Sequence, residues 1–485
     1  MDIGTTAVKA AVFDSEGRAL GIGAAEYTLE TPVPDIVELD AEEYWRSSCD
    51  AMARAVAAAR IEPDRIAAMS ITGQAETLIV TDSAGRPLRK AIVWLDNRAK
   101  TEAADILREF GAEELFAFSG QTEMLPCWPA AKILWYRRHQ PELFATTARY
   151  LMVEDYIYFR LSGTFATCRG LLPSTLYFDI RTGEYHRAML EFLHLRPEQL
   201  PPLRDSGEPM GRTAPNASVV PAGVTVAAAP LDHVCGNLGS GCVEPGMISA
   251  TTGCTMAVCA AFPRLVYDPQ RRLSTYLGFA PGTCVLLPWA PSAGMLLRYF
   301  RDEFAGGMDY AALDAAAEEV APGSEGLLLL PHCAGAVSPV CNPAARGVAY
   351  GVTLAHKRAH WARAIMESVA YLLRDNILAL RQLGADITSV RALGGAARSG
   401  LWLRIMADVL DMPVSVTACE EATALGAAIL GAAAAGDFPD PAAAARQLVR
   451  VARQTTPGAD SGRYQELFQR YQELNSLLLP TFGNR

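Results

Sequence analysis

The sequence predicts an α/β protein made of two ribonuclease-H-like domains with a ligand-binding cleft between them. Two observations support this prediction. A hairpin with a Gly/Thr-rich turn opens each half of the chain, at residues 1–14 and again at 247–260. Strands and helices then follow in both halves in a similar order, as a duplicated unit requires. Such a duplication places its ligand in the cleft between the copies.

The length and composition fit two domains of a soluble protein. The chain has 485 residues and 50% of them are hydrophobic, which is enough for two or three cores. A Pro245-Gly246 pair separates the two series of elements, so we expect an N-terminal domain at 1–244 and a C-terminal domain at 245–485. The net charge of −10 argues against nucleic acid as a partner, because no basic stripe is present to neutralise its phosphates.

The sequence also argues against a membrane span and a disulfide framework. The uncharged stretch 273–297 is interrupted by prolines, and the Ala/Gly-rich run 422–436 is shorter than the roughly 20 residues that a bilayer needs. Eleven cysteines occur without a C-x-x-C pair and lie mostly inside apolar runs, which is typical of reduced packing residues. We therefore expect a cytoplasmic protein without a membrane partner or a structural metal site.

The first hairpin offers groups that suit the phosphates of ATP. Apolar positions surround a Gly-Thr-Thr turn, which presents the hydroxyls of Thr5 and Thr6, and Lys9 follows in the next strand. Neither a G-x-x-x-x-G-K-[ST] loop nor a G-x-G-x-x-G motif after a strand occurs in the sequence. The hairpin is of a kind that can bind ATP phosphates without a P-loop, and a P-loop or a dinucleotide-binding Rossmann motif is not expected.

Two polar segments follow predicted strands later in the first half. After a predicted helix at 41–59 with Asp40 as its N-cap, the strand 66–73 leads into Gln74 to Thr77, and a later strand ends in Trp94-x-Asp96-x-Arg98. Groups just past strand ends are where α/β sheets bind ligands. The alternative is a core Trp beside a surface Asp/Arg pair that contributes less than about 1 kcal/mol to stability.

A single carboxylate and a phosphate-sized turn occur close together in the middle of the chain. Asp232 follows the strand-like run 223–229, and the turn Thr252-Gly253-Cys254-Thr255 comes about twenty residues later. This arrangement suits phosphoryl transfer to an alcohol: the carboxylate takes the hydroxyl proton, while N–H and hydroxyl donors hold the phosphates. A helix-capping Asp and a plain hairpin turn are the alternatives.

The segment Asp2 to Thr6, with Lys9, resembles the opening phosphate motif of the FGGY family of carbohydrate kinases. Further segments resemble the family in the same order along nearly the whole chain, and together they are specific although no single one is. They are the Pro-x-x-Lys helix, the Asp-Tyr stretch, the second signature, the adenosine loop and a small-residue helix, at 126–136, 154–163, 345–371, 393–402 and 420–428. Only Met1 precedes Asp2, where members usually have several apolar residues. A mis-set start codon or a trimmed sequence would explain this difference; otherwise the first strand is shortened at the edge of the site.

The resemblance implies an ATP-dependent sugar kinase of the actin/hexokinase-like fold, with the acceptor in the first domain and ATP on the second. It implies Asp232 as the catalytic base, and Asp2 with Asp232 as the groups that hold Mg²⁺ and its waters. The implied acceptor site comprises Gln74, Ala75, Glu76, Trp94, Asp96, Arg98, Asp232 and His233. The implied ATP site comprises Thr5, Thr6, Lys9, Thr252, Gly253, Cys254, Thr255, Gly294, Gly394, Gly395, Ala396, Ala397 and Ser399.

The resemblance leaves the substrate open. The nearest relatives look like xylulokinases, so a pentulose such as D-xylulose is the first expectation, whereas the Glu76 loop is closer to that of glycerol kinases. A polyol such as glycerol or erythritol, an aldonate such as gluconate, a non-catalytic sugar- or ATP-binding relative and an actin-like ATPase are the alternatives. The sequence departs from the family pattern at two positions of the site. Cys254 replaces a hydroxyl donor of the phosphate turn, and His233 follows the catalytic Asp. A homodimer is expected from the fold alone.

Overall fold

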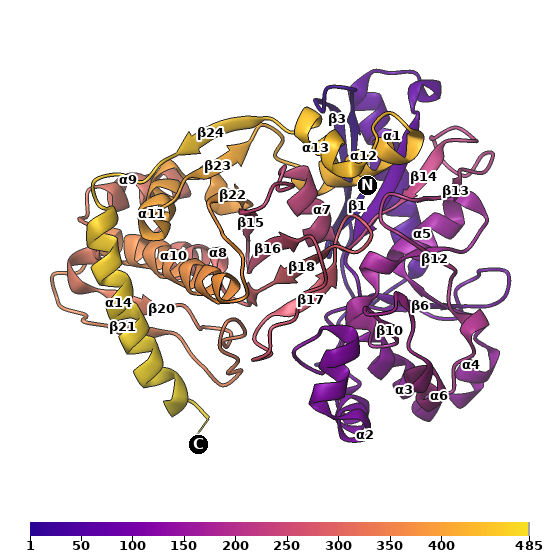
Figure 1. Ribbon diagram of the computed structural model, residues 1–485, viewed down its shortest axis with the longest axis horizontal. Coiled ribbons are helices and arrows are strands. Elements are labelled where there is room, and N and C mark those ends of the chain that lie inside the picture. Colours follow the sequence, from indigo (N-terminus) through magenta and orange to yellow (C-terminus); the bar gives the residue numbers. More distant parts are fainter. Residues whose placement is uncertain (484–485) are drawn as a thin grey trace.

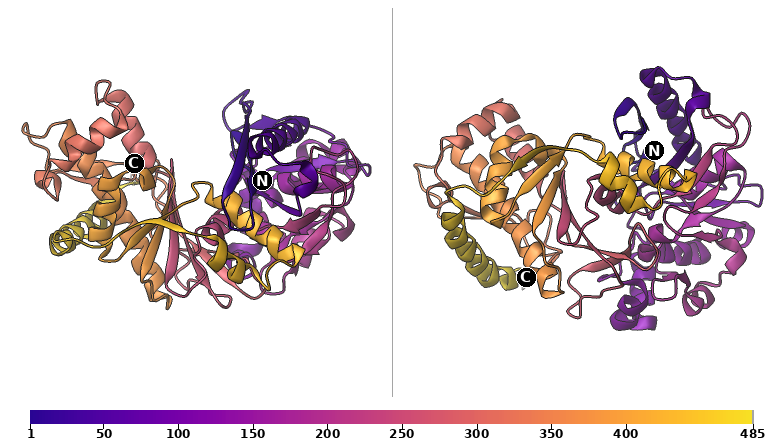
Figure 2. Two further views of the ribbon diagram at one scale, coloured as in Figure 1. Left: turned by 90° about the horizontal axis from the view of Figure 1, so that it is seen from above. Right: turned by 45° about the horizontal axis from the view of Figure 1, so that its top comes forward.

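The computed structural model describes residues 1–483 and shows two lobes, each built on one large sheet (Figure 1). The first lobe is formed mainly by the N-terminal half and the second by the C-terminal half. Seen from above, the lobes diverge from a middle region that joins them (Figure 2). No helix among residues 1–483 combines the length and the apolar character needed to cross a bilayer.

The sheet of the first lobe has a central hairpin series followed by parallel strands. β1, β2 and β3 are antiparallel neighbours, β5 and β14 run parallel to β1, and β13 closes the far edge in the antiparallel direction. In spatial order the strands are β13 (Pro209–Arg212), β14 (Thr225–Ala228), β5 (Ala68–Gly73), β1 (Asp2–Ile3), β2 (Ala7–Phe13) and β3 (Ala19–Glu26). The first strand, Asp2–Ile3, is two residues long.

The sheet of the second lobe repeats this plan. β15, β16 and β18 are antiparallel, β22 and β23 run parallel to β15, and β24 is antiparallel at the edge. The spatial order is β17 (Ser274–Leu277), β18 (Cys284–Leu287), β16 (Met256–Phe262), β15 (Met247–Thr252), β22 (Ser389–Leu393), β23 (Val414–Thr417) and β24 (Val451–Thr455), with β19 (Trp289–Ala290) also paired to β16. The predicted duplication is therefore confirmed at the level of strand order and direction.

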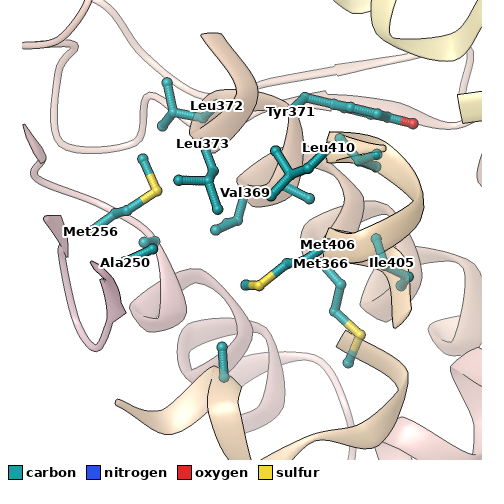
Figure 3. Close-up of a cluster of buried hydrophobic side chains, with 14 of the residues drawn as sticks. Ala250, Met256, Met366, Val369, Tyr371, Leu372, Leu373, Ile405, Met406 and Leu410 are labelled. Atoms are coloured by element: carbon teal, nitrogen blue, oxygen red, sulfur yellow. The ribbon is translucent and has the colours of Figure 1, made fainter. Parts of the chain in front are cut away.

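Amphipathic helices cover the sheets and form the cores. α1 (Ala41–Ala59) packs on β2 and β3, and the carboxylate of Asp40 accepts a hydrogen bond from the N–H of Glu42 at 3.0 Å, so the predicted cap is present. In the second lobe, Met366, Val369, Leu372 and Leu373 of α10 pack among side chains of the sheet and of α11 (Figure 3). The second-lobe helices are α8 (Gly294–Glu303), α9 (Tyr310–Glu318), α10 (Arg358–Gln382), α11 (Gly400–Leu410) and α14 (Ser461–Leu478).

A smaller four-stranded sheet extends the first lobe beside the acceptor segments. Its strands are β4 (Glu38–Leu39), β7 (Ala91–Ile92), β6 (Leu78–Thr81) and β8 (Arg149–Met152), and the nearby helices are α2 (Lys100–Ser119), α3 (Pro129–His139), α4 (Pro141–Thr146), α5 (Val153–Ser162) and α6 (Arg187–Leu193). Short pairs complete the chain: β9 (Thr167–Cys168) with β12 (Leu203–Arg204), β10 (Phe178–Asp179) with β11 (Glu184–Tyr185), and β20 (Leu328–Leu330) with β21 (Val348–Tyr350).

Two helices from late in the chain return to the first lobe. α12 (Ala422–Ala435) and α13 (Pro441–Leu448) lie beside the N-terminus in Figures 1 and 2, and α12 contacts β5, β14 and α7 (Asp232–Gly239). The crossing of α7 and α12 is close, because a Cβ atom on Gly426 would lie 1.9 Å from the carbonyl oxygen of Cys235. The backbones therefore touch at this crossing, where only glycine fits.

Candidate functional site

The first-lobe segments predicted to bind ligands lie along one edge of the sheet. β1, β5 and β14 are parallel neighbours, with Ile3 opposite Gly73 and Ile71 opposite Ala228. Their carboxyl ends therefore deliver the Thr5–Thr6 turn, the Gln74–Glu76 segment and Asp232 to the same edge. The buried hydroxyl of Thr72 donates to the carbonyl oxygen of Pro230 at 2.8 Å, which fixes the approach to Asp232.

Asp232 begins α7 and has a second carboxylate close by. Its Oδ1 accepts a hydrogen bond from the N–H of His233 at 2.6 Å, and its side chain is half-buried. Burial, followed by the negative charge of Asp232, raises the pKa of Asp2 to about 7. The buried Oδ1 of Asp2 has no hydrogen-bond partner among residues 1–483. The two carboxylates therefore lie close enough for their charges to repel, although the N-terminal ammonium and Lys9 act on Asp2 in the opposite direction.

Glu76 is held in an uncommon backbone conformation. Its φ is 71°, in the left-handed region that residues other than glycine rarely adopt. The buried ammonium of Lys132 donates to its carbonyl oxygen at 2.6 Å, and the hydroxyl of Ser174 donates to its carboxylate. Burial raises the pKa of Glu76, and Asp232 and His233 lie near enough to influence it. A residue with a strained backbone, held at its carbonyl by Lys132 and at its carboxylate by Ser174, is typical of a ligand site.

The two residues before Glu76 face the protein interior. The amide nitrogen of Gln74 donates to the carbonyl oxygen of Gly4 at 3.0 Å and to the hydroxyls of Tyr27 and Tyr44 at 3.3 and 3.2 Å. Ala75 is 2% exposed and packs in an apolar cluster. Gln74 thus ties the acceptor segment to the phosphate turn through Gly4.

Trp94 and the Asp96–Arg98 pair occupy different surroundings. The indole N–H of Trp94 donates to the hydroxyl of Thr5 at 3.0 Å, which links the two segments. Asp96 is fully buried, and its carboxylate accepts from the N–H of Val37 at 2.7 Å and from the Arg98 side chain at 2.7 and 2.8 Å. Arg98 also pairs with Glu38 at 2.6 Å. The side chains of Asp96 and Arg98 thus both bind partners within the protein, and their role in binding the acceptor substrate stays a prediction.

The residues of the first hairpin that were predicted to bind phosphate differ in how freely they can reach a ligand. Thr5 and Thr6 form the turn between β1 and β2, and the side chain of Thr6 is exposed. Lys9 reaches across to the second half of the chain and pairs with Glu421 at 2.9 Å. Its ammonium group is therefore already engaged by a carboxylate at the start of α12.

A second edge, in the second lobe, gathers the predicted ATP residues. Thr251 on β15 lies opposite Leu393 on β22, so the turns that follow these parallel strands are neighbours. A Cβ atom on Gly394, whose φ is 79°, would lie 2.8 Å from the carbonyl oxygen of Thr252. A Cβ atom on Gly294, at the start of α8, would lie 2.3 Å from the carbonyl oxygen of Gly253. Glycine is required at both positions because the backbones approach so closely.

The remaining predicted ATP residues complete this edge. Cys254 and Thr255 are exposed, whereas the buried hydroxyl of Thr252 has no hydrogen-bond partner among residues 1–483. Gly395, Ala396 and Ala397 form a short 3-10 turn, and Ser399 caps α11 by accepting from the N–H of Trp402 at 3.0 Å. The turn 252–255, the start of α8 and the segment 394–399 form one surface.

Several residues beside Glu76 were not predicted as site residues. Lys132 belongs to the segment 126–136, which resembles a helix of the family without a predicted chemical role, although a lysine inside an apolar helix is itself a signal. Glu154 is buried beside Gly73 with both carboxylate oxygens unpartnered within the described chain, and burial raises its pKa well above the ordinary range. Ser174 and Tyr276 carry no sequence signal, because only the tertiary fold places them beside Glu76.

The arrangement suits phosphoryl transfer between two sets of groups. The first edge presents carboxylates and hydrogen-bonding side chains that match the hydroxyls of a small polar molecule. The second presents backbone and hydroxyl donors at turns and the N-terminus of a helix, which match phosphates and a nucleoside. Helix α7 joins them, since it begins at Asp232 and contacts β15 and β16 of the second sheet.

Comparisons with known proteins identify the family to which the chain belongs. The N-terminal domain of the FGGY family of carbohydrate kinases matches residues 1–239 and its C-terminal domain matches residues 284–435. The chain is similar to a gluconokinase from Bacillus subtilis (strain 168), with 29% identity over 99% of this chain and 95% of that protein. It is similar to a glycerol kinase from Citrifermentans bemidjiense, with 31% identity over 99% of this chain and 98% of that protein.

The fold is shared with solved structures of such kinases. A xylulose kinase from Rhodospirillum rubrum superposes with a TM-score of 0.90 and 28% identity, covering 100% of this chain and 99% of that one. This overlap establishes the two-domain actin/hexokinase-like fold for nearly every residue. From the matched domains, the near-complete coverage and the shared fold, we conclude that the chain belongs to the FGGY family of carbohydrate kinases, which are ATP-dependent phosphotransferases.

Proposed function

We propose that this kinase transfers the γ-phosphoryl group of ATP to one hydroxyl of a small polyhydroxy acceptor, with Asp232 as the general base. One observation carries the proposal. Asp232 stands at the carboxyl edge of the first sheet beside Asp2 and Glu76, on the helix that contacts the second sheet. Its carboxylate takes the proton of the acceptor hydroxyl as the oxygen attacks the γ-phosphorus, and the bond from that phosphorus to ADP breaks.

The second edge holds ATP in this proposal. The turn Thr252 to Thr255, whose Cys254 and Thr255 are exposed, contacts the phosphates from the second lobe, and the Thr5–Thr6 turn contacts them from the first. Close backbone approach at Gly294 and Gly394 holds the start of α8 and the segment 394–399 against the turn 252–255, where the nucleoside would bind. Closure of the lobes excludes water, which favours the acceptor alcohol over hydrolysis.

The residues present fit Mg²⁺, which prefers one or two carboxylates and retains several waters. Asp2 supplies a buried carboxylate oxygen without a partner in the described chain, and Asp232 supplies a second carboxylate. When bound, Mg²⁺ neutralises charge on the β- and γ-phosphate oxygens. Burial and then repulsion from Asp232 raise the pKa of Asp2, and a bound cation would relieve the repulsion between the two carboxylates.

A pentulose such as D-xylulose is the first acceptor to test. The similarity to a solved xylulose kinase supports it, and the similarities to a gluconokinase and a glycerol kinase at nearly equal identity support gluconate and a polyol such as glycerol or erythritol as alternatives. The backbone N–H of His233 donates to Asp232, and Glu76 lies near enough to Asp232 and His233 for their charges to act on it, so both residues are candidates to contact the acceptor. The domain bounds 1–244 and 245–485 and a homodimer remain predictions.

The decisive experiment measures ADP release with Mg²⁺ and ATP across D-xylulose, D- and L-ribulose, L-xylulose, glycerol, erythritol, xylitol and gluconate. Asp232→Asn keeps the size of the side chain and removes the base, so we expect kcat to fall by about 10²–10⁴. Asp50→Asn, on the exposed face of α1, is the matched control and should retain full activity. An acceptor panel that never stimulates ADP release, or an Asp232→Asn variant with wild-type kcat, would overturn the proposal.

A further inference from the structure

Strand β17 belongs to the second sheet but is anchored to the first lobe. The N–H of Thr275 donates to the carbonyl oxygen of Gly120 at 2.8 Å, and the amide nitrogen of Gln121 donates to the carbonyl oxygen of Thr275 at 3.2 Å. The hydroxyls of Ser274 and Thr122 lie 3.3 Å apart. A Cβ atom on Gly120 would lie 2.7 Å from the Thr275 carbonyl oxygen, so the two backbones are in contact.

This anchoring directs Tyr276 toward the acceptor side of the first lobe. Side chains alternate along a strand, so Tyr276 shares a face with Ser274, which contacts Thr122 of the first lobe. Thr275, on the opposite face, instead donates its hydroxyl proton to the carbonyl oxygen of Val266 at 2.9 Å within the second half. β17 also contacts the 3-10 turn Pro173–Thr175, which carries Ser174.

Tyr276 therefore lies in the group formed by Ser174 and Glu76. Ser174 is fully buried and its hydroxyl donates to the Glu76 carboxylate. Removal from water and then the charge of Glu76 raise the pKa of the Tyr276 phenol well above its ordinary value, and Ser174 acts in the opposite direction. The phenol is therefore neutral over the working pH range and can both donate and accept a hydrogen bond.

We infer that Tyr276 is a specificity-determining residue of the acceptor site, and that its phenol binds an acceptor hydroxyl remote from the one that Asp232 activates. The inference rests on the proposed function. Asp232 influences Glu76, the hydroxyl of Ser174 donates to Glu76, and the strand that carries Tyr276 contacts the turn that carries Ser174. The acceptor class that uses all of these groups is a polyhydroxy chain of four or more carbons, whose distal hydroxyl a three-carbon polyol lacks.

Because Tyr276 belongs to the second sheet, its contact with the acceptor also couples the choice of acceptor to the relative position of the lobes. The acceptor contacts Glu76 of the first lobe and Tyr276 of the second, so its binding stabilises their contact. A three-carbon polyol engages only the first of these. The site then discriminates against a three-carbon polyol for two reasons: the polyol makes no contact with Tyr276, and it leaves the phenol hydroxyl without a hydrogen-bond partner.

The test compares Tyr276→Phe with Tyr267→Phe. Both remove one phenolic oxygen, and Tyr267 lies beside Arg181 and Asp179, away from Glu76. Calorimetry on the full chain measures affinity for D-xylulose, xylitol, gluconate and glycerol, and coupled ADP release gives KM for the acceptor and for ATP. We expect Tyr276→Phe to weaken the best four- to six-carbon acceptor roughly tenfold, with KM for ATP, melting temperature and any glycerol affinity unchanged. Tyr267→Phe should match wild type throughout.

Ser174→Ala provides a contrasting variant, because it removes the hydroxyl that donates to the Glu76 carboxylate. Every acceptor contacts Glu76 in this proposal, so Ser174→Ala should weaken the long acceptors and glycerol alike, whereas Tyr276→Phe spares glycerol. The role of Tyr276 would be overturned if Tyr276→Phe and Tyr267→Phe bound the long acceptors with equal affinity, or if Tyr276→Phe lost as much affinity for glycerol as for the long acceptors. The kinase proposal would remain intact in either case. Acceptor binding by wild type without ADP release overturns the proposed function alone, and no binding of any acceptor overturns both.

Discussion

The ammonium group of Lys132 lies inside the first lobe and donates to the carbonyl oxygen of Glu76 at 2.6 Å and to that of Val93 at 3.1 Å. These carbonyls belong to the two segments that carry Glu76 and Trp94. Burial lowers the pKa of Lys132 to about 8, which shows how far the group is removed from water. One side chain of α3 therefore sets the spacing between the two acceptor segments.

Replacing Lys132 with Met should loosen both segments. Loss of the donor leaves buried carbonyl groups unpartnered, at a cost of about 1–3 kcal/mol in the free energy of unfolding. We expect KM for the acceptor to rise several-fold while KM for ATP changes little, because the second edge is untouched. Lys90→Met, at an exposed lysine paired with Glu30, is the matched control. Equal increases in both KM values would show that Lys132 supports only global stability.

Gly394→Ala should impair ATP binding. The added Cβ would lie 2.8 Å from the carbonyl oxygen of Thr252, so the segment 394–399 and the phosphate turn must move apart. Gly384→Ala is the control, since its φ of 90° imposes similar backbone strain but nothing lies within 4 Å of its Cβ. Steady-state kinetics should show a higher KM for ATP only for the first variant. If the two variants behave alike, strain rather than contact explains any effect.

Glu367 forms a buried centre in the second lobe that should matter for stability and not for substrate choice. Its carboxylate accepts from Arg363 at 3.0 Å, Tyr464 at 2.9 Å, Ser324 at 3.0 Å and the N–H of Gly323 at 2.9 Å. Glu367→Gln leaves the buried Arg363 guanidinium uncompensated, so we expect a loss of about 3–5 kcal/mol in urea unfolding. The exposed Glu466→Gln should be neutral, and a shift in acceptor preference for Glu367→Gln would contradict this assignment.

Asp155 should give the protein a pH-dependent stability. Burial raises its pKa from 3.8 to about 7, so between these values the folded protein binds a proton that the unfolded chain has released. Its contribution to stability therefore falls as pH rises from about 4 to about 7. Asp155→Asn can still accept from the N–H of Met152, which lies 2.9 Å from Oδ2, and removes the ionisation.

We expect the Asp155→Asn substitution to become more favourable with pH, gaining on the order of 1 kcal/mol per pH unit relative to wild type across this window. Urea unfolding near pH 5 and near pH 8 measures the difference. Asp50→Asn, at an exposed site, should show no such trend. A constant difference between Asp155→Asn and wild type at both pH values would rule out Asp155 as the source.

Features that depend on neighbouring residues were predictable from the sequence. The hairpin expected at 247–260 forms β15 and β16, and the helix expected at 41–59 is α1 with Asp40 as its cap. Turn chemistry and apolar periodicity encode both within a few residues. The duplicated sheet followed because the same local signals recur in both halves.

Features that depend on distant pairing were not predictable. Asp96 and Arg98 follow a strand, which favours a ligand role, but pairing of β4 with β7 brings Glu38 and Val37 beside them. Tyr276 reaches Glu76 only because Thr275 and Gly120 join segments that lie far apart in the sequence. No local pattern specifies such contacts, since periodicity assigns a face to a side chain but not a partner.

The return of α12 and α13 to the first lobe has a consequence for how the protein is made. Residues 422–448 leave the ribosome after most of the chain, so the surfaces of β5 and α7 that α12 covers stay open until late in synthesis. Exposed apolar surface of this kind promotes aggregation and engages chaperones. A fragment ending at residue 244 should accordingly precipitate, whereas supplying 422–448 through a short flexible linker should restore its solubility.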